Sequence, residues 1–447
     1  MKKVYFVSLG CDKNLVDSEQ MMSLLFRGGY GFCDEMEEAD AVIVNTCCFI
    51  GDAKQESIEA LIEAGELKDK GKLSYIIAAG CLAERYQEEI GKELPEVDAV
   101  VGSTAFDEIT TVLDGLFQKE KDERRVFRKD INILTNPETD RIISTPGHYE
   151  YLKVAEGCDK NCTYCIIPSL KGHYRSIPKE RLLSDAVFLA ENGVRELILV
   201  AQETTLYGTD LCGKKMLPGL LRDLSKIEGL SRIRLLYCYP EEIDDELIKT
   251  IRDLPKVMKY LDIPIQHCSD RILKRMGRRA TKEGLRSLIE KLREEIPDIS
   301  LRTTIITGFP GESEEEHREL LDFIKEIRFD RLGVFTYSQE EGTAAAGFDD
   351  QISEEVKERR RDELMTVQRE ISLSINEGFL GRKLECMVEG RIPEEGIYAT
   401  RSFRDAPDVD GFVFVTEKPG MSLLTGDMAE VRITGFSEYD LEGEIIQ

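Results

Sequence analysis

Short apolar runs alternate with amphipathic helical segments along most of this chain, and this alternation limits the possible folds more than any other feature. In the first part the apolar runs read KVYFVSLG, AVIVNTC, SYIIAAGC and VDAVVGS, with helical segments such as 54–67 between them. Strands that are separated by helices pair in parallel through right-handed crossovers. Residues 1–118 are therefore predicted to form a parallel α/β sheet domain.

The alternation resumes later and continues through six further rounds. The predicted strands read YLKVAEG, RELILVAQ, RIRLLYCY, YLDIPIQH, LRTTIITG and RLGVFTYS. Pro178 fits the first turn of a helix, and Ser313 with Glu316 has the form of a capping box. Six β/α units are too few to close an eight-unit barrel. Residues 145–376, ending in a helix over 353–377, are predicted to form an incomplete (β/α)6 barrel with an open mouth.

The two remaining segments have different textures. Residues 119–144 are polar and rich in turn formers (QKEKDERR, TNPETD), so we predict a linker. Residues 377–447 hold short β-rich runs (KLECMVEG, GFVFVT, MAEVRITGF) between turns, which is typical of a small antiparallel β-barrel. This terminal segment has 15 acidic and 7 basic residues, a net charge of -8.

Composition excludes several classes of protein. No run of 18 apolar residues occurs, and the apolar stretch in MKKVYFVSLGC is too short for a secretory signal, so we expect a cytoplasmic protein without a membrane span. The formal charge of -26 disfavours nonspecific binding to nucleic acid, which leaves only local contacts. Twelve cysteines in such a chain indicate metal or redox chemistry rather than disulfides.

Three cysteines, Cys158, Cys162 and Cys165, lie close together in EGCDKNCTYC. They follow the first predicted barrel strand, so they lie at the mouth where active-site groups collect. Three thiolates can hold three irons of a 4Fe-4S cluster and leave the fourth iron open to a cofactor. Zinc is the competing metal, but a structural zinc site needs four protein ligands and no local residue completes this one.

A second set, Cys11, Cys47 and Cys81, is dispersed in sequence, but each cysteine directly follows a predicted parallel strand. Loops after such strand ends meet in one crevice, so the three thiols should converge and hold a second cluster. The alternative is that small apolar cysteines lie near strand ends by chance. Cys48 is adjacent to Cys47 and is the alternative ligand at this position. The other cysteines, Cys33, Cys212, Cys238, Cys268 and Cys386, share no spacing.

The motif C-x3-C-x-aromatic-C at the start of an incomplete β/α barrel resembles the radical S-adenosylmethionine superfamily. The resemblance implies that Cys158, Cys162 and Cys165 bind a cluster whose open iron takes S-adenosylmethionine, and that Tyr164 lies near the adenine. It also implies reductive cleavage of the cofactor to a 5'-deoxyadenosyl radical that abstracts hydrogen from an unactivated carbon. The protein then supplies position and exclusion of water.

The whole chain is similar to the methylthiotransferases, as SLGCDKNLVDSE, VNTCCF, AGCLAERY, YLKVAEGCDKNCTYCIIPSLKG, LDIPIQH, TGFPGE and DAPDVDG show. The resemblance implies an amino-terminal methylthiotransferase domain, a radical S-adenosylmethionine core and a terminal TRAM domain. It also implies two 4Fe-4S clusters, of which the second supplies or carries the sulfur. One S-adenosylmethionine methylates that sulfur and another supplies the radical.

Further candidates for contact with cofactor or substrate follow predicted strand ends and match family positions: Gln202, Glu203, Gln266, His267, Arg302 and 308–312 including Gly308. Arg302 could meet the cofactor carboxylate with its planar fork. His267 fits a simple hydrogen-bonding role equally well. No catalytic residue is expected beyond the cluster ligands.

The local motifs are similar to the RimO type, which modifies the β-carbon of an aspartate of small-subunit ribosomal protein S-twelve. EGC around Cys158, IPSLKG after Cys165, and DAPDVDG carry this resemblance, although Asp12 and Cys48 depart from the family pattern. The acidic terminal segment suits a basic protein better than phosphates. Alternatives are methylthiolation of a modified adenosine beside the tRNA anticodon, and a non-catalytic iron-sulfur carrier or sensor. We expect a monomer that uses an external electron donor and a sulfur donor.

Overall fold

The first part of the chain is a six-stranded sheet in which every pair of neighbours is parallel. The computed structural model describes residues 1–118, 125–135, 141–418, 420 and 422–446. The strand order is β2-β1-β3-β4-β5-β6. The strands are β1 (Lys3–Ser8), β2 (Gly31–Phe32), β3 (Ala41–Thr46), β4 (Tyr75–Ala79), β5 (Ala99–Val101) and β6 (Arg125–Phe127). The four predicted strands are confirmed, whereas the short strands β2 and β6 were not predicted.

Helices cover both faces of this sheet, because strand β3 is buried at every position and β4 at every position after its first. Val42 and Val44 of β3 pack into one core, while Ala41 and Ile43 of the same strand pack into the other. The two-residue period of a strand sends alternate side chains to opposite faces. The helices are α1 (Asp12–Arg27), α2 (Gly51–Asp69), α3 (Gly80–Arg85), α4 (Gln87–Glu93) and α5 (Ile109–Phe117).

The second part is an open barrel of six parallel strands, as predicted. The strands are β7 (Tyr149–Lys153), β10 (Glu196–Val200), β11 (Arg232–Leu235), β12 (Tyr260–Asp262), β13 (Ser300–Thr307) and β14 (Arg331–Thr336). They form two three-stranded sheets, β7-β10-β11 and β12-β13-β14. The sheets join where Ile233 bridges Val257 and where the Cys238 N–H donates to the Asp262 carbonyl at 2.9 Å. Among the described residues no ladder connects β7 to β14, so the barrel stays open.

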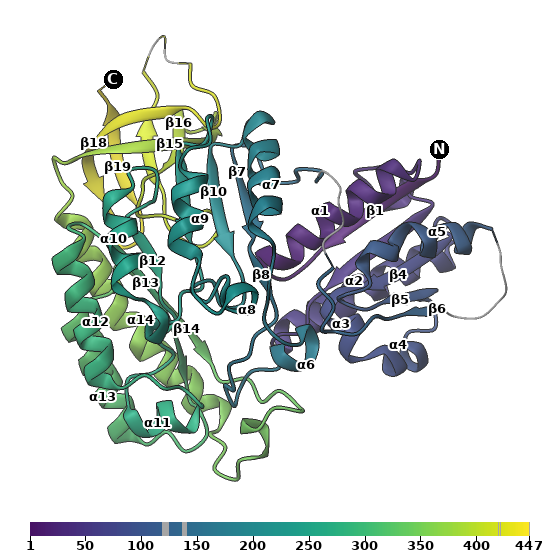
Figure 1. Cartoon of the computed structure of the whole chain (residues 1–447), viewed down its shortest axis with the longest axis horizontal. Coiled ribbons are helices and arrows are strands. Elements are labelled where there is room, and N and C mark those ends of the chain that lie inside the picture. The colour runs from purple at the N-terminus through teal and green to yellow at the C-terminus, as the bar shows by residue number, and fades with distance from the viewer. Residues whose placement is uncertain (119–124, 136–140, 419, 421, 447) are drawn as a thin grey trace.

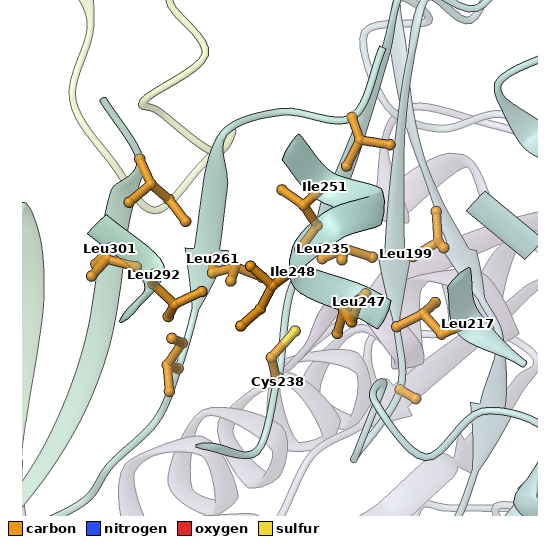
Figure 2. Packing of buried hydrophobic residues seen from close by; sticks show 14 of the residues in the cluster. Leu199, Leu217, Leu235, Cys238, Leu247, Ile248, Ile251, Leu261, Leu292 and Leu301 are labelled. Atoms are coloured by element: carbon orange, nitrogen blue, oxygen red, sulfur yellow. The ribbon is translucent and has the colours of Figure 1, made fainter. Parts of the chain in front are cut away.

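Helices pack around the outside of this barrel and bury its largest core. They are α7 (Lys179–Glu191), α9 (Leu217–Leu224), α10 (Asp245–Asp253), α12 (Lys282–Glu295), α13 (Glu314–Ile327) and α14 (Glu354–Glu377), with short helices α6 (Ile167–Lys171), α8 (Thr209–Cys212) and α11 (Asp270–Arg275). Figure 2 shows Leu247, Ile248 and Ile251 of α10 beside Leu235 and Leu261 of the strands. The predicted capping box at the start of α13 is present.

The third part is a closed five-stranded barrel. Its strands are β15 (Lys383–Ile392), β16 (Ile397–Arg401), β17 (Val413–Thr416), β18 (Met428–Phe436) and β19 (Leu441–Ile445), in the order β15-β16-β17-β19-β18. Four of its neighbouring pairs are antiparallel, but β17 and β19 are parallel. The predicted small β-barrel is confirmed, and its single parallel pair, β17 with β19, was not predicted.

The terminal barrel closes the amino end of the partial barrel through residues 401–410, which we call the floor segment (Figure 1). The first residue of each of the six strands contacts it. Tyr149 donates to Asp408 at 2.9 Å, Glu196 accepts from Arg401 at 2.8 Å, and Arg232 donates to the Arg401 carbonyl at 3.0 Å. Tyr260 donates to Asp410 at 2.7 Å, Ser300 donates to the Arg404 carbonyl at 3.4 Å, and Arg331 pairs with Asp405. The carboxyl end of the barrel is therefore its mouth.

The predicted linker, 119–144, is only partly described. Residues 119–124 and 136–140 lie outside the described residues, and β6 falls inside the predicted linker range. The domain limits that the sequence suggests stay predictions. No helix in the described parts of the chain is long and apolar enough to cross a membrane.

Candidate active site between the first domain and the barrel mouth

The first cysteine triad lies on the loop between β8 (Ala155–Glu156) and α6. This loop turns back closely at Gly157, whose φ is +78° and where a Cβ would lie 2.1 Å from the His173 carbonyl oxygen. The Cys158 N–H donates to the Gly172 carbonyl at 3.1 Å. Burial raises the pKa of Cys158 to about 11 and that of Cys165 to about 12, and neighbouring thiols of the triad add to each rise. The structure thus brings these cysteines together on one partly buried loop.

The second triad is assembled from three strand ends. Cys11 follows β1, Cys47 follows β3, and Cys81 lies at the start of α3 after β4. A Cβ on Gly10 would lie 2.7 Å from the Cys47 Cβ, so the Cys11 loop passes directly against Cys47. Burial holds the pKa of Cys81 well above its usual range, and Cys47 and Cys11 raise it further. The dispersed cysteines therefore converge at the carboxyl edge of the first sheet, as parallel topology requires.

Cys47 and its neighbour Cys48 have different surroundings. The Cys48 side chain is fully buried in the apolar core on one face of the sheet, and burial raises its pKa to about 12. Cys47 is slightly exposed, and its N–H and carbonyl group both bond to the Ser57 hydroxyl at 2.9 Å, which fixes the loop. Its Sγ would lie 2.9 Å from a Cβ on Gly10. Cys47 thus faces the Cys11 loop, whereas Cys48 belongs to the core.

Three thiols in each triad are the kind of donor that binds an iron-sulfur cluster. Within the described ranges no three His, Cys, Asp or Glu side chains are grouped as ligands of one metal ion. A single zinc needs every sulfur at about 2.3 Å from the same centre. In a cubane each thiolate binds a different iron, so the sulfurs stand further apart. Two triads without a fourth ligand fit that arrangement.

Buried charges connect the two triads. Lys153 at the end of β7 pairs with Asp17 of α1 and, at 2.8 Å, with Glu156. Lys171 at the end of α6 lies 3.3 Å from Asp17 and 3.7 Å from Glu156. Its charge offsets part of the rise that burial causes in the pKa of Cys81. All four charged groups are buried, so solvent screens them little. This pairing fixes α6, which follows the first triad, against the helix that follows Cys11.

A second contact holds the Cys11 loop against the barrel. The Lys13 ammonium lies 3.3 Å from the centre of the Tyr237 ring and 2.7 Å from Asp12. The Tyr237 hydroxyl donates to Asp12 at 3.3 Å. Tyr237 follows β11 with a φ of +60°, a conformation that is costly for a side chain of this size. The second triad therefore stands at the mouth of the barrel, on the same side as the first.

Several buried polar atoms at this mouth have no partner among the described residues. They include Oε1 of Gln202, Oε2 of Glu203 and Oε1 of Gln266. Gln266 also has a φ of +70°, and burial raises the pKa of Glu203 to about 7. Leaving such groups unpaired costs about 1–3 kcal/mol each. Polar atoms of this kind fit a polar cofactor such as S-adenosylmethionine.

The other predicted contacts occupy varied positions. Tyr164 is half-buried against the cluster of Ile272, Met276, Phe309, Tyr337 and Ala345. Gly308 has a φ of +70°, and its N–H donates to Glu312 at 2.5 Å. The roles of both toward a cofactor stay predictions.

Arg302 and His267 are already hydrogen-bonded to protein groups. Arg302 donates to Asp262 at 2.8 Å and lies 3.6 Å from Asp410 of the floor segment. His267 is fully buried and accepts from the Ser269 N–H at 2.9 Å, and burial lowers its pKa to about 3. This geometry gives His267 a structural hydrogen bond, and Arg302 as a cofactor ligand stays a prediction.

Two residues beside the first triad were missed by the sequence analysis. The Tyr239 hydroxyl lies 2.7 Å from the Cys162 Sγ, and the Arg278 guanidinium lies 3.9 Å from the Tyr239 ring centre. Tyr239 follows β11, so a search of every strand end for aromatic hydroxyls would have found it. Arg278 follows α11 in a loop, where no spacing or period marks it.

Three family models match the chain. They are Uncharacterized protein family UPF0004 over residues 3–102, the Radical SAM superfamily over residues 152–324, and the TRAM domain over residues 380–446. The radical SAM match runs from β7 into α13, so it covers the first triad and all of the partial barrel except its last strand and helix. The fold and this match define a radical S-adenosylmethionine enzyme, whose cofactors are S-adenosylmethionine and a 4Fe-4S cluster.

Curated relatives match along the full length. A protein of Lachnoclostridium phytofermentans named Ribosomal protein uS12 methylthiotransferase RimO is 54% identical over 441 residues, 99% of each chain. Proteins of the same name from Acetivibrio thermocellus and Geobacter sulfurreducens are 50% and 48% identical over 100% of this chain, and 98% and 99% of their own. The chain belongs to the RimO family of radical S-adenosylmethionine methylthiotransferases.

Solved structures support the fold. The radical S-adenosylmethionine methyltransferase TsrM from Kitasatospora setae has a TM-score of 0.54 at 16% identity, covering 75% of this chain and 73% of its own. The cobalamin-dependent S-adenosylmethionine radical enzyme OxsB has a TM-score of 0.55 at 14% identity, covering 82% and 56%. At these identities the likeness concerns the fold alone.

Proposed function

We propose that this enzyme inserts a methylthio group at the β-carbon of an aspartate of small-subunit ribosomal protein S-twelve, and that it uses two 4Fe-4S clusters. Cys158, Cys162 and Cys165 hold one cluster, and Cys11, Cys47 and Cys81 hold the other. When bound, the clusters and S-adenosylmethionine supply the radical and the sulfur. The protein residues bind these groups, orient them and exclude water.

The observation that carries the two-cluster proposal is the packing of the Cys11 loop against the barrel mouth. The contact of Lys13 with Tyr237 supports a second cluster site beside the strand ends that also carry Gln202 and Gln266. Lys171 pairs with Asp17 of α1, the helix that follows Cys11. Lys171 itself is the last residue of α6, the short helix that follows Cys165. Sulfur transfer needs a sulfur donor and a radical source at one substrate, and two triads at a common mouth meet that need.

The choice of a ribosomal protein over tRNA depends on the relatives and on charge. The curated relatives reported above all carry the ribosomal protein name. The terminal barrel has a net charge of -8, which opposes phosphate and favours a basic protein. In addition, most of its floor segment, residues 401–407, is packed against the barrel strands, which leaves little of that segment open to RNA. The tRNA alternative is therefore not favoured.

The experiment compares cells with and without the gene. We expect ribosomal protein S-twelve from the deleted strain to lack the mass of one methylthio group, and the gene to restore it. The tRNA adenosine modification should be unchanged. A deleted strain with unmodified tRNA and normally modified ribosomal protein S-twelve would overturn the assignment of the substrate.

A second experiment tests the cofactors. Anaerobically reconstituted protein should hold about eight irons, and Cys81→Ala about four, since each cubane has four. With S-adenosylmethionine and a reductant the protein should release 5'-deoxyadenosine. Equal iron in both proteins would remove the second cluster from the proposal.

An external electron donor, a sulfur donor, a monomeric state and a cytoplasmic location belong to the same proposal, together with domain limits of 1–118, 145–376 and 377–447.

A further inference from the structure

Arg278 is a buried arginine that has too few partners. Its side chain has 0% exposure. One nitrogen, Nη2, donates to the Pro264 carbonyl at 2.8 Å and lies 3.9 Å from a carboxylate oxygen of Glu241. The other two nitrogens, Nε and Nη1, are buried and have no hydrogen-bond partner among the described residues. The guanidinium therefore keeps the three N–H donors of these two nitrogens unused in a buried site.

The loop that carries Arg278 is packed directly on the first cysteine triad. Gly277 has a φ of +74°, and a Cβ there would lie 2.3 Å from the Asn161 carbonyl oxygen and 3.5 Å from the Cys162 Cα. Thr163 donates its N–H to the Met276 carbonyl at 2.9 Å. Because these contacts leave no space for a side chain at Gly277, the loop holds Arg278 in a fixed place beside Cys162.

Tyr239 connects the arginine to the triad. Its ring lies 3.9 Å from the Arg278 guanidinium carbon, and its hydroxyl lies 2.7 Å from the Cys162 Sγ. Lys160 also approaches this ring, at 4.9 Å, but Glu242 neutralises it at 2.5 Å. Arg278 has no carboxylate so near. Its nearest carboxylate among the described residues is Glu241 at 3.9 Å, so of the two cations at this ring it is the one with the more distant counter-charge.

An arginine is charged at all relevant pH values, and burying an ion without a close counter-charge costs several kcal/mol. Glu241 at 3.9 Å compensates the Arg278 charge only in part, and the unpartnered Nε and Nη1 leave a place for a second anion. A 4Fe-4S cluster on three thiolates carries a net negative charge and gains another on reduction. Net charge and hydrogen bonds to the sulfurs set the reduction potential of such clusters.

We propose that Arg278 is the counter-charge of the cluster held by Cys158, Cys162 and Cys165, and that it raises the reduction potential of that cluster. It is a positioning residue, since it acts on the cluster through charge. The inference rests on the proposed ligation of this cluster. It does not depend on the second cluster or on the identity of the substrate.

The test is a redox titration of the full chain, followed by electron paramagnetic resonance of the reduced cluster. All variants carry Cys81→Ala, so the signal belongs to the first cluster. Arg278→Met removes the charge, and Arg278→Lys keeps it. Arg279→Met is the matched control, because Arg279 is the next residue, is exposed, and loses the same charge.

We expect Arg279→Met to keep the parent potential. Arg278→Met should lower it by at least a tenfold change in the reduction equilibrium, which is about 59 mV for one electron. Arg278→Lys should recover most of that shift. If Arg278→Met binds no iron, Arg278→Lys decides: an iron-loaded lysine variant near the parent potential supports the proposal, and an unloaded one overturns it.

Two further results would overturn the inference. One is an iron-loaded Arg278→Met protein with the potential of Arg279→Met. The other is an unchanged potential with weakened binding of S-adenosylmethionine, which would assign the arginine to the cofactor carboxylate. Failure of the proposed function is a separate result, because a protein that leaves ribosomal protein S-twelve unmodified still has a measurable potential for its first cluster.

Discussion

Replacing Gly10 by alanine tests the second triad at its tightest contact. Gly10 has a φ of +89°, and a Cβ there would lie 2.7 Å from the Cys47 Cβ and 2.9 Å from its Sγ. The left-handed backbone costs an alanine about 1–2 kcal/mol. Overpacking adds about 1–3 kcal/mol, because Cys47 is fixed by Ser57 and must move. We expect a total destabilisation of about 2–5 kcal/mol, localised at the loop that carries Cys11.

Gly29→Ala is a matched control in the same domain. Gly29 has a φ of +86°, and a Cβ there would have no atom within 4 Å. It therefore has the backbone cost alone, about 1–2 kcal/mol. Both variants are reconstituted anaerobically, and iron is counted per chain. Gly29→Ala should keep about eight irons, whereas Gly10→Ala should keep about four, since only the second cubane is lost.

The reasoning fails if Gly10→Ala holds as much iron as Gly29→Ala. That outcome would mean that Cys47 does not ligate a cluster, or that the Cys11 loop adapts without cost. Loss of both clusters in Gly10→Ala would also contradict it, because the first triad stands on a different loop.

The remaining predictions concern sulfur insertion, the floor segment and acid stability. Cys81→Ala should still cleave S-adenosylmethionine but yield no methylthio product, and product detected by mass spectrometry would count against the second cluster. Arg401→Met should lower the free energy of unfolding by about 1.5–3 kcal/mol, because it removes one of the two buried arginines that pair with Glu196 and leaves Arg234 as its partner. Arg391→Met, which breaks an exposed pair, should cost under about 1 kcal/mol, and equal urea midpoints for the two would refute this. Burial lowers the pKa of His267 from 6.5 to about 3. Between these pH values the proton binds only the unfolded chain, so the free energy of unfolding decreases as the pH is lowered. From pH 6.5 to about pH 5 the wild type should lose about 2 kcal/mol more than His267→Asn, and parallel urea curves would contradict that.

The sequence was sufficient for the elements whose pattern is local. The apolar runs of β3 and β10 are buried along their whole length, so their composition alone predicted central parallel strands. The convergence of Cys11 and Cys47 also followed from the sequence, because parallel topology brings strand ends to one edge whatever the loops between them do.

Other features depend on contacts that no local pattern encodes. The parallel pair of β17 with β19 joins two strands that are not consecutive in the chain, so no local pattern predicts it. Arg302 meets Asp410, a residue of a different domain, so its partner could not be found from its own strand. The position of Arg278 near Cys162 depends on the packing of the Gly277 loop against residues 161–162, which no sequence pattern predicts.

The floor segment also fixes an order of assembly during synthesis. Domains form from the amino terminus as the ribosome extends the chain. All six strands of the partial barrel are translated before residues 401–410, so Arg232 and Arg331 lack their hydrogen-bond partners until the last module emerges, whereas Glu196 keeps Arg234. A nascent or truncated chain that stops before this module would therefore expose two unpartnered arginines at the base of an otherwise complete core.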